Sequence, residues 1–190
     1  TMESIFTLPY SEYETIVKLQ HIFKKKDGYS VYIPTSRQQK GVDLIIHNSI
    51  TNKFIRVQVK SSRSYVNKSK RKKENNYRYH LWFNNFINRY QLGTADIYLL
   101  FGLFPQYDSK YKIKSKNKFW SSILLILTDA EMKDLLNSVK TKKEKKTDSF
   151  FGFGFDSYDL IYGVRGFKEP TDYSKYLLHN RLEVIEKLLS

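Results

Sequence analysis

Three short segments between Tyr29 and Ser61 alternate apolar and polar residues, and this pattern restricts the fold more than any other feature. They are Tyr29–Ile33, Val42–His47 and Phe54–Ser61. Alternation with a period of two is typical of strands that bury one face, and turn-rich residues join the second segment to the third. Residues 11–26 precede them with apolar residues at helical spacing, and Gly28 follows as a stop. We therefore expect a helix followed by a three-stranded meander.

The rest of the chain continues this mixture of strands and helices. Further strands are predicted at Tyr77–Phe86, Asp96–Phe104 and Trp120–Leu127, a helix at Ala130–Val139 capped by Asp129, a loop at Phe150–Phe155, and a final helix at Tyr173–Leu189. This order predicts an α+β fold with a mixed sheet, in a single domain over residues 1–190. The core of this domain covers about residues 11–104, and residues 119–190 form a C-terminal elaboration.

Composition narrows the class of protein. The chain has no cysteine, which excludes a disulfide framework and a thiolate zinc site and suits a cytoplasmic protein. No apolar run reaches the length of a membrane span, so no membrane partner is expected. Lys and Arg number 33 against 19 Asp and Glu, a net charge of +14. Such a positive field favours a polyanionic partner such as DNA, although a lysine-rich coding bias produces the same excess.

Asp43, Gln58 and Lys60 form the pattern D-x(14)-Q-x-K on two predicted strands. Gln58 and Lys60 point to one face because side chains two apart share a face, and Asp43 reaches that face if the strands are antiparallel neighbours. Carboxylate and carboxamide oxygens are hard ligands that suit Mg²⁺. A neighbouring ammonium can orient a water and stabilise charge on a phosphoryl group. The three residues therefore predict phosphodiester hydrolysis.

The segments GVDLII and FIRVQVKSS resemble the PD-(D/E)xK nuclease superfamily, in the variant where glutamine replaces the acid of the second half-motif. This QxK form is familiar from Mrr-type restriction endonucleases and from proteins related to Holliday-junction resolvases. The resemblance covers about residues 11–62, where ETIVKLQHIFKKKDGYSVYIP matches the family's first helix and strand. It implies a restriction-endonuclease-like fold, with helices flanking the mixed sheet, and a Mg²⁺-dependent DNA endonuclease in which Mn²⁺ can substitute.

By this resemblance Asp43 and Gln58 ligate the metal, the main-chain carbonyl of Val59 completes the shell, and Lys60 is the catalytic lysine. Val42 stands in the place of the family's proline. The neutral Gln58 removes one negative charge, which leaves open a nucleic-acid-binding module that kept the fold and lost turnover. An adaptor in a defence or repair complex is a further alternative. Many relatives cut both strands as homodimers, and this chain is compatible with that arrangement.

A carboxylate from the first helix is the remaining ligand that the resemblance implies. Glu14 takes this position, and Glu12 is the alternative. Glu14 also lies three residues after Ser11, the spacing of a helix-capping box. The two roles draw on one side chain, so the sequence leaves both open.

Contacts to the nucleic-acid backbone are expected from cations that flank the proposed centre in the sequence. These are Arg37, Lys40, Arg63, Lys68, Lys70, Arg71, Lys72 and Lys73. Lysine and arginine contact phosphates without reading bases. Tyr77, Tyr79 and Trp82 can stack on bases, but their strand-like alternation favours packing within the sheet.

Overall fold

The computed structural model describes residues 10–34, 41–66, 77–84, 86–105, 120–140 and 149–190, without the side chain of Arg63. The described helices are α1 (Tyr10–Ile22), α2 (Asp129–Ser138) and α3 (Leu182–Leu189). The described strands are β1 (Tyr29–Tyr32), β2 (Leu44–Asn48), β3 (Lys53–Val66), β4 (Tyr79–Asn84), β5 (Ile97–Pro105), β6 (Trp120–Thr128), β7 (Phe150–Phe155), β8 (Tyr162–Arg165) and β9 (Thr171–Asp172). Short 3₁₀ turns cover Lys25–Asp27, Ile87–Arg89, Ser174–Tyr176 and Leu178–Asn180.

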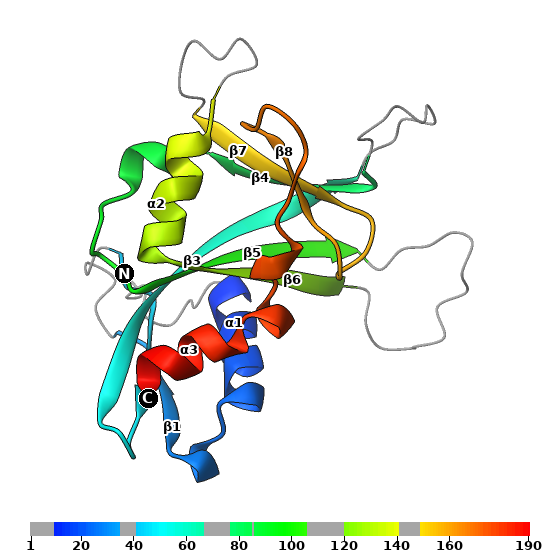
Figure 1. Cartoon of the computed structure of the whole chain (residues 1–190). Coiled ribbons are helices and arrows are strands. Elements are labelled where there is room, and N and C mark those ends of the chain that lie inside the picture. Colours follow the sequence, from blue (N-terminus) through cyan, green and yellow to red (C-terminus); the bar gives the residue numbers. More distant parts are fainter. Residues whose placement is uncertain (1–9, 35–40, 67–76, 85, 106–119, 141–148) are drawn as a thin grey trace, which may run out of the picture.

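Strand β3 belongs to two sheets because it is 14 residues long, more than any neighbour. Its first part pairs antiparallel with β2 and parallel with β5, which gives the first sheet the mixed order β1-β2-β3-β5-β6. Its last residues, Ser64–Val66, pair with β4, and β7, β8 and β9 continue the second sheet. The strand runs from one sheet into the other (Figure 1).

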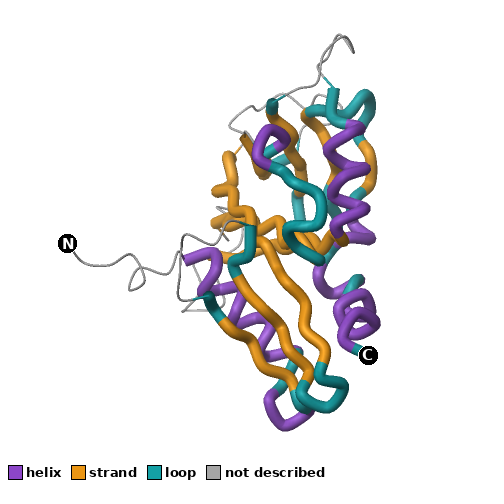
Figure 2. The backbone as a smooth tube through the Cα atoms, turned by 90° about the vertical axis from the view of Figure 1, so that its left-hand side faces the viewer, coloured by secondary structure: helices purple, strands orange, loops and turns teal. Residues whose placement is uncertain are grey.

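Both faces of the first sheet are covered. Helices α1 and α3 lie on one face, where Leu19 and Ile185 pack with Val57 (Figure 1). Figure 2 shows β1, β2 and β3 extending side by side, with a helix behind them. Helix α2 and strands β4 and β7 cover the other face, where Leu81 and Phe153 belong to a second apolar core. Because β5 lies between these layers, its sequence is nearly unbroken in apolar residues.

The predicted α+β class is confirmed, with a mixed sheet flanked by helices in one compact unit. All six segments predicted as strands before residue 128 form strands, although their ends move by a few residues. Strand β3 continues past the predicted end at Ser61 because its last residues find a partner in β4. None of the described helices is long and apolar enough to cross a membrane.

The prediction of a loop at Phe150–Phe155 is wrong, because these residues form β7 between β4 and β8. The three phenylalanines Phe151, Phe153 and Phe155 point into the core and are fully buried. The alternate glycines leave room for rings on the outer face: a Cβ on Gly154 would come within 2.3 Å of Tyr77. Glycine therefore marks a close approach within a strand here, and not a break in it.

The predicted ends of the helices are also partly wrong. The final helix covers only Leu182–Leu189, because β9 and two 3₁₀ turns occupy the residues before it. Helix α1 already begins at Tyr10, so Ser11 lies inside the helix and its carbonyl accepts a 2.6 Å hydrogen bond from the Thr15 hydroxyl. Helix α2 is capped by Thr128, not Asp129, in a capping box with Glu131.

Candidate active site

Asp43 is held against the edge of β3 at the point where β2 begins. Its backbone N–H donates to the Val57 carbonyl at 2.9 Å, and its carboxylate Oδ2 accepts from the Val59 N–H at 2.7 Å. The first pair of the antiparallel ladder is Leu44 with Val57. The carboxylate therefore lies alongside the residues that flank Gln58, as the antiparallel arrangement predicts.

Gln58 and Lys60 project from β3 toward the face of the sheet opposite α1. Val57 and Val59, which alternate with them, pack in the core under α1 and α3. Gln58 is only 9% exposed. Together with Tyr98 and Arg89, the two side chains line a cavity of about 400 Å³. The structure thus brings Asp43, Gln58 and Lys60 together in one place, as the strand period predicts.

The surroundings of Lys60 disfavour its charged form. Burial lowers the pKa of the Lys60 ammonium below its ordinary value, and the nearby Arg89 lowers it further. The carboxylates of Asp43 and Glu12 act in the opposite direction. The Nζ atom lies 5.3 Å from the centroid of the Phe86 ring, a cation–π contact. Lys60 is therefore a partly desolvated ammonium between two acids and a second cation.

The edge of β3 next to Asp43 offers a backbone oxygen. The Val59 N–H points toward the β2 side, where it bonds Asp43, and the N–H and C=O of a strand residue point to the same side. Strand β2 begins at Leu44 and β4 pairs only from Ser64, so neither strand covers this edge at Val59. The Val59 carbonyl therefore faces the side on which the Asp43 carboxylate lies.

These oxygen donors could hold a hard cation, although they carry little charge. The described residues contain no group of three or more His, Cys, Asp and Glu side chains that could hold a metal ion. The Asp43 carboxylate, the Gln58 carboxamide and the Val59 carbonyl nevertheless provide oxygen donors of three kinds. Mg²⁺ commonly takes one or two carboxylates and keeps several waters, so the donor set fits Mg²⁺ with only one carboxylate from the two strands.

Glu14, the helix carboxylate expected in this shell, does not face it. Its Oε1 accepts a 3.3 Å hydrogen bond from Ser122 of β6. Ser122 lies on the same face of its strand as Leu124, which packs under α1 and α3, whereas Lys60 lies on the opposite face. Glu14 therefore approaches the wrong side of the sheet for metal ligation with Asp43.

Glu12, the alternative to Glu14, lies close enough to Lys60 to act on its charge. It is 8% exposed, and its charge raises the pKa of Lys60. Two residues along a helix turn a side chain by about 200°, so only one of the two glutamates can face the site. The sequence contains both residues, and the packing of α1 decides between them.

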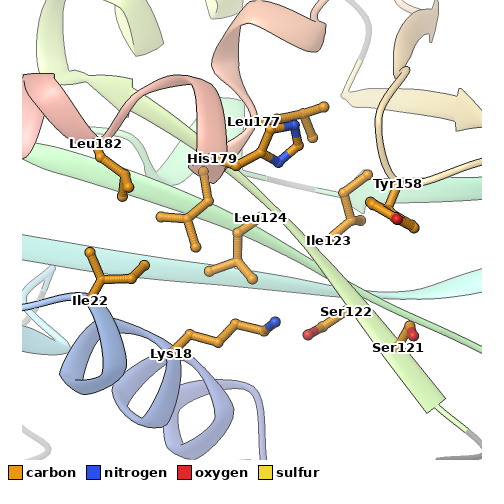
Figure 3. A pocket seen from close by; sticks show the side chains of 11 residues that line it. Lys18, Ile22, Ser121, Ser122, Ile123, Leu124, Tyr158, Leu177, His179 and Leu182 are labelled. Carbon is orange, nitrogen blue, oxygen red and sulfur yellow. The ribbon is translucent and has the colours of Figure 1, made fainter.

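Ser122, the partner of Glu14, lines a second cavity, which lies between α1, β6 and the segment before α3 (Figure 3). It measures about 450 Å³, and its floor is apolar, with Ile22, Leu124 and Leu182. Lys18 points toward Ser122 across its mouth (Figure 3). This cavity contains none of the three motif residues, so it is separate from the candidate active site.

The segment from Phe86 to Asp96 closes one wall of the active-site cavity, and the sequence carried no signal for it. Asp129 anchors the segment through hydrogen bonds of 2.7 Å from the Tyr90 hydroxyl and from the Gly93 N–H. Asp96 fixes its other end by a 2.8 Å ion pair with Arg56. Two predicted strands flank this segment, but no local pattern indicates that it folds back over β3.

The segment also packs against the turn that carries Asp43. Gly41 has φ of +85°, and a Cβ there would overlap the Thr94 side chain at 1.9 Å. Only glycine allows both the left-handed backbone and this close approach. The loop before β2 and the segment after β4 therefore meet at the rim of the cavity.

Most of the predicted phosphate contacts fall outside the described residues. This applies to Arg37, Lys40, Lys68, Lys70, Arg71, Lys72 and Lys73. Arg63 lies in β3, but its side chain is not described. Among the aromatic residues, Tyr79 is buried in the core, whereas Tyr77 stacks on Tyr162 and Trp82 on His80. The prediction of packing within the sheet agrees with these contacts.

Comparison with known proteins adds no family assignment: the chain matches no protein-family model, no curated protein and no solved structure.

Proposed function

We propose that the protein is a metal-dependent DNA endonuclease whose centre is formed by Asp43, Gln58 and Lys60. One observation carries this proposal: a buried carboxamide and a partly desolvated ammonium line one cavity from β3, and the Asp43 carboxylate bonds the main chain between them. An apolar core does not need such a group, and burying it costs stability. Strained or costly polar clusters of this kind are typical of functional sites.

Each residue has a role that follows from its position. Asp43, Gln58 and the Val59 carbonyl would hold Mg²⁺, with Mn²⁺ as a substitute. When bound, the ion would neutralise charge on the phosphoryl group and lower the pKa of a bound water. Lys60 is two residues from Gln58 on the same face, so its ammonium orients the attacking water and stabilises the developing charge. The lowered pKa of Lys60 leaves a larger fraction of its side chain as the free amine, the form that can accept a proton, than in an exposed lysine.

Glu12 supplies the second negative charge that Gln58 lacks. A site with Asp43 alone and one ammonium carries no net charge, and a divalent cation would bind it weakly. Glu12 acts electrostatically on Lys60 and is buried on α1. We therefore include Glu12, in place of Glu14, as the carboxylate that gives the site a negative charge for the metal.

The test is cleavage of plasmid DNA and of single-stranded DNA with Mg²⁺, with Mn²⁺ and with EDTA. Asp43→Asn, Lys60→Met and Glu12→Gln are expected to lose at least about 100-fold in rate, the usual effect of one general acid–base or electrostatic group. Glu14→Gln is the matched control, because it makes the same change two residues away on the opposite face of the sheet, and it is expected to keep the wild-type rate.

Two outcomes would contradict this function. Cleavage that survives in EDTA or in Lys60→Met would point to a contaminating nuclease. Salt-sensitive DNA binding without cleavage in either metal would favour the alternative, a binding module that lost turnover. The neutral Gln58 is the observation that favours this alternative.

A further inference from the structure

Two cations from different elements line the same cavity. Lys60 projects from β3, and Arg89 lies in the 3₁₀ turn Ile87–Arg89 of the segment that closes the wall. Neither side chain forms an ion pair with any residue in the described part of the chain. Like charges that share a cavity repel each other. An anion between them would remove that repulsion.

The backbone that carries Arg89 is held in place. The Arg89 N–H donates to the Phe86 carbonyl at 2.9 Å, and Tyr90, the next residue, is tied to Asp129. The guanidinium itself stays exposed. The fixed backbone means that only the Arg89 side chain has to be ordered when it binds a ligand, and its exposure leaves it accessible.

The remaining lining of the cavity does not compete for an anion. Gln91 and Thr94 contribute neutral polar groups at the rim. The acids beside this wall are already engaged: Asp43 Oδ2 accepts from the Val59 N–H, and the two Asp129 carboxylate oxygens accept from the Tyr90 hydroxyl and the Gly93 N–H. A volume of about 400 Å³ falls within the usual range of small-ligand pockets, about 300–1,000 Å³.

We propose that Arg89 and Lys60 bind a phosphate group in this cavity, with Arg89 gripping two of its oxygens. The planar guanidinium donates two parallel hydrogen bonds to a phosphate, which an ammonium cannot do. The identification of this phosphate with the scissile group of DNA rests on the proposed function. The anion site itself does not, because it is built from residues that bind without any metal.

The experiment measures binding of inorganic phosphate in EDTA by isothermal titration calorimetry, at fixed ionic strength, with no catalysis involved. Wild type, Arg89→Met and Arg89→Lys are compared. Arg165→Met is the matched control: it removes the same charge from an exposed arginine, which stacks on Trp82 and Phe150 of the second sheet. The melting temperature of each variant verifies that it is folded.

We expect Arg89→Met to weaken phosphate binding by about tenfold or more, as for a lost hydrogen bond to a charged group. Arg89→Lys is expected to lie between this variant and wild type, and Arg165→Met within about twofold of wild type, since a distant surface charge acts only through a screened field. Equal losses in Arg89→Met and Arg165→Met, or no phosphate binding by wild type, would overturn the proposal.

Cleavage assays of the same variants separate this proposal from the nuclease proposal. Phosphate binding that depends on Arg89 in a protein without nuclease activity would support the anion site and reject the nuclease. Cleavage by Arg89→Met with the wild-type kcat/KM would reject the anion site as part of the reaction, while the nuclease proposal would stand.

Discussion

Replacing Gln58 by glutamate restores the second acid of the motif and separates metal binding from folding. The new carboxylate would lie about 5 Å from Asp43, the spacing of neighbouring strands, and about 7 Å from Lys60, two residues along one strand. With an effective dielectric constant of about 20, these contacts give roughly 3.3 kcal/mol of repulsion and roughly 2.4 kcal/mol of attraction. The two nearly cancel. Because Gln58 is 9% exposed, desolvation remains, and metal-free Gln58→Glu is expected to be about 1–3 kcal/mol less stable than wild type.

Mg²⁺ is expected to offset much of this loss of stability. A ligand that binds only the folded state stabilises it by RT ln(1 + [L]/Kd), so tighter binding adds stability at a fixed ligand concentration. A carboxylate in place of the neutral carboxamide of Gln58 should tighten Mg²⁺ binding by at least about tenfold, or about 1.4 kcal/mol at saturation. This gain is only a small part of the Coulomb attraction between the new carboxylate and Mg²⁺, because the carboxylate and the ion both lose hydration when they bind. The free energy of unfolding, measured by urea titration in EDTA and in excess MgCl₂, reports both effects.

Gln20→Glu is the matched control, since Gln20 is exposed on α1 and gains the same charge far from the motif. Its stability is expected to depend on Mg²⁺ no more than that of wild type. If Gln58→Glu gains no more from Mg²⁺ than Gln20→Glu does, position 58 does not face a metal, and the reasoning that places the ion beside Asp43 fails.

Three further predictions follow from burial and packing. Burial lowers the pKa of Lys60, so just below the ordinary lysine value of 10.5 the unfolded chain binds more protons than the folded protein. Stability therefore rises with pH there; Lys60→Met should lack this rise in urea titrations, and an unchanged slope would contradict it. Burial raises the pKa of Tyr98 to about 12, so stability falls as pH rises from the ordinary value of 10.0 toward 12. Tyr98→Phe should remove this loss, because phenylalanine has no hydroxyl to ionise; a variant that loses as much stability as wild type between pH 10.0 and 12 would refute this. Gly102→Ala places a Cβ 2.4 Å from Leu81 and 2.9 Å from Ile123, and should lower the free energy of unfolding by about 1–3 kcal/mol, whereas a neutral result would show that this core can adjust.

The parts of the fold and site that could be predicted depend on neighbours close in the sequence. Alternation located β1, β2 and β3, because a strand that buries one face carries that period in its own residues. Asp43, Gln58 and Lys60 could be grouped for the same reason, since a turn joins two adjacent strands and residues 58 and 60 share a face. The prediction at Phe150–Phe155 was wrong because glycine is found both in loops and in strands where another group approaches closely. The close approach of the Tyr77 and Trp82 rings, which are distant from these glycines in the sequence, shows that the glycines lie within a strand.

Local periods in the chain thus determined the meander β1-β2-β3 and the grouping of a carboxylate, a carboxamide and an ammonium on it. Tertiary packing decided which glutamate of α1 approaches that edge, because Glu12 and Glu14 differ only in how the helix is rotated against the sheet. It also decided that Arg89 joins the site, since Asp129 on a distant helix holds the segment that carries it. Contacts between residues far apart in the chain depend on how layers pack, and no single stretch of sequence contains that information.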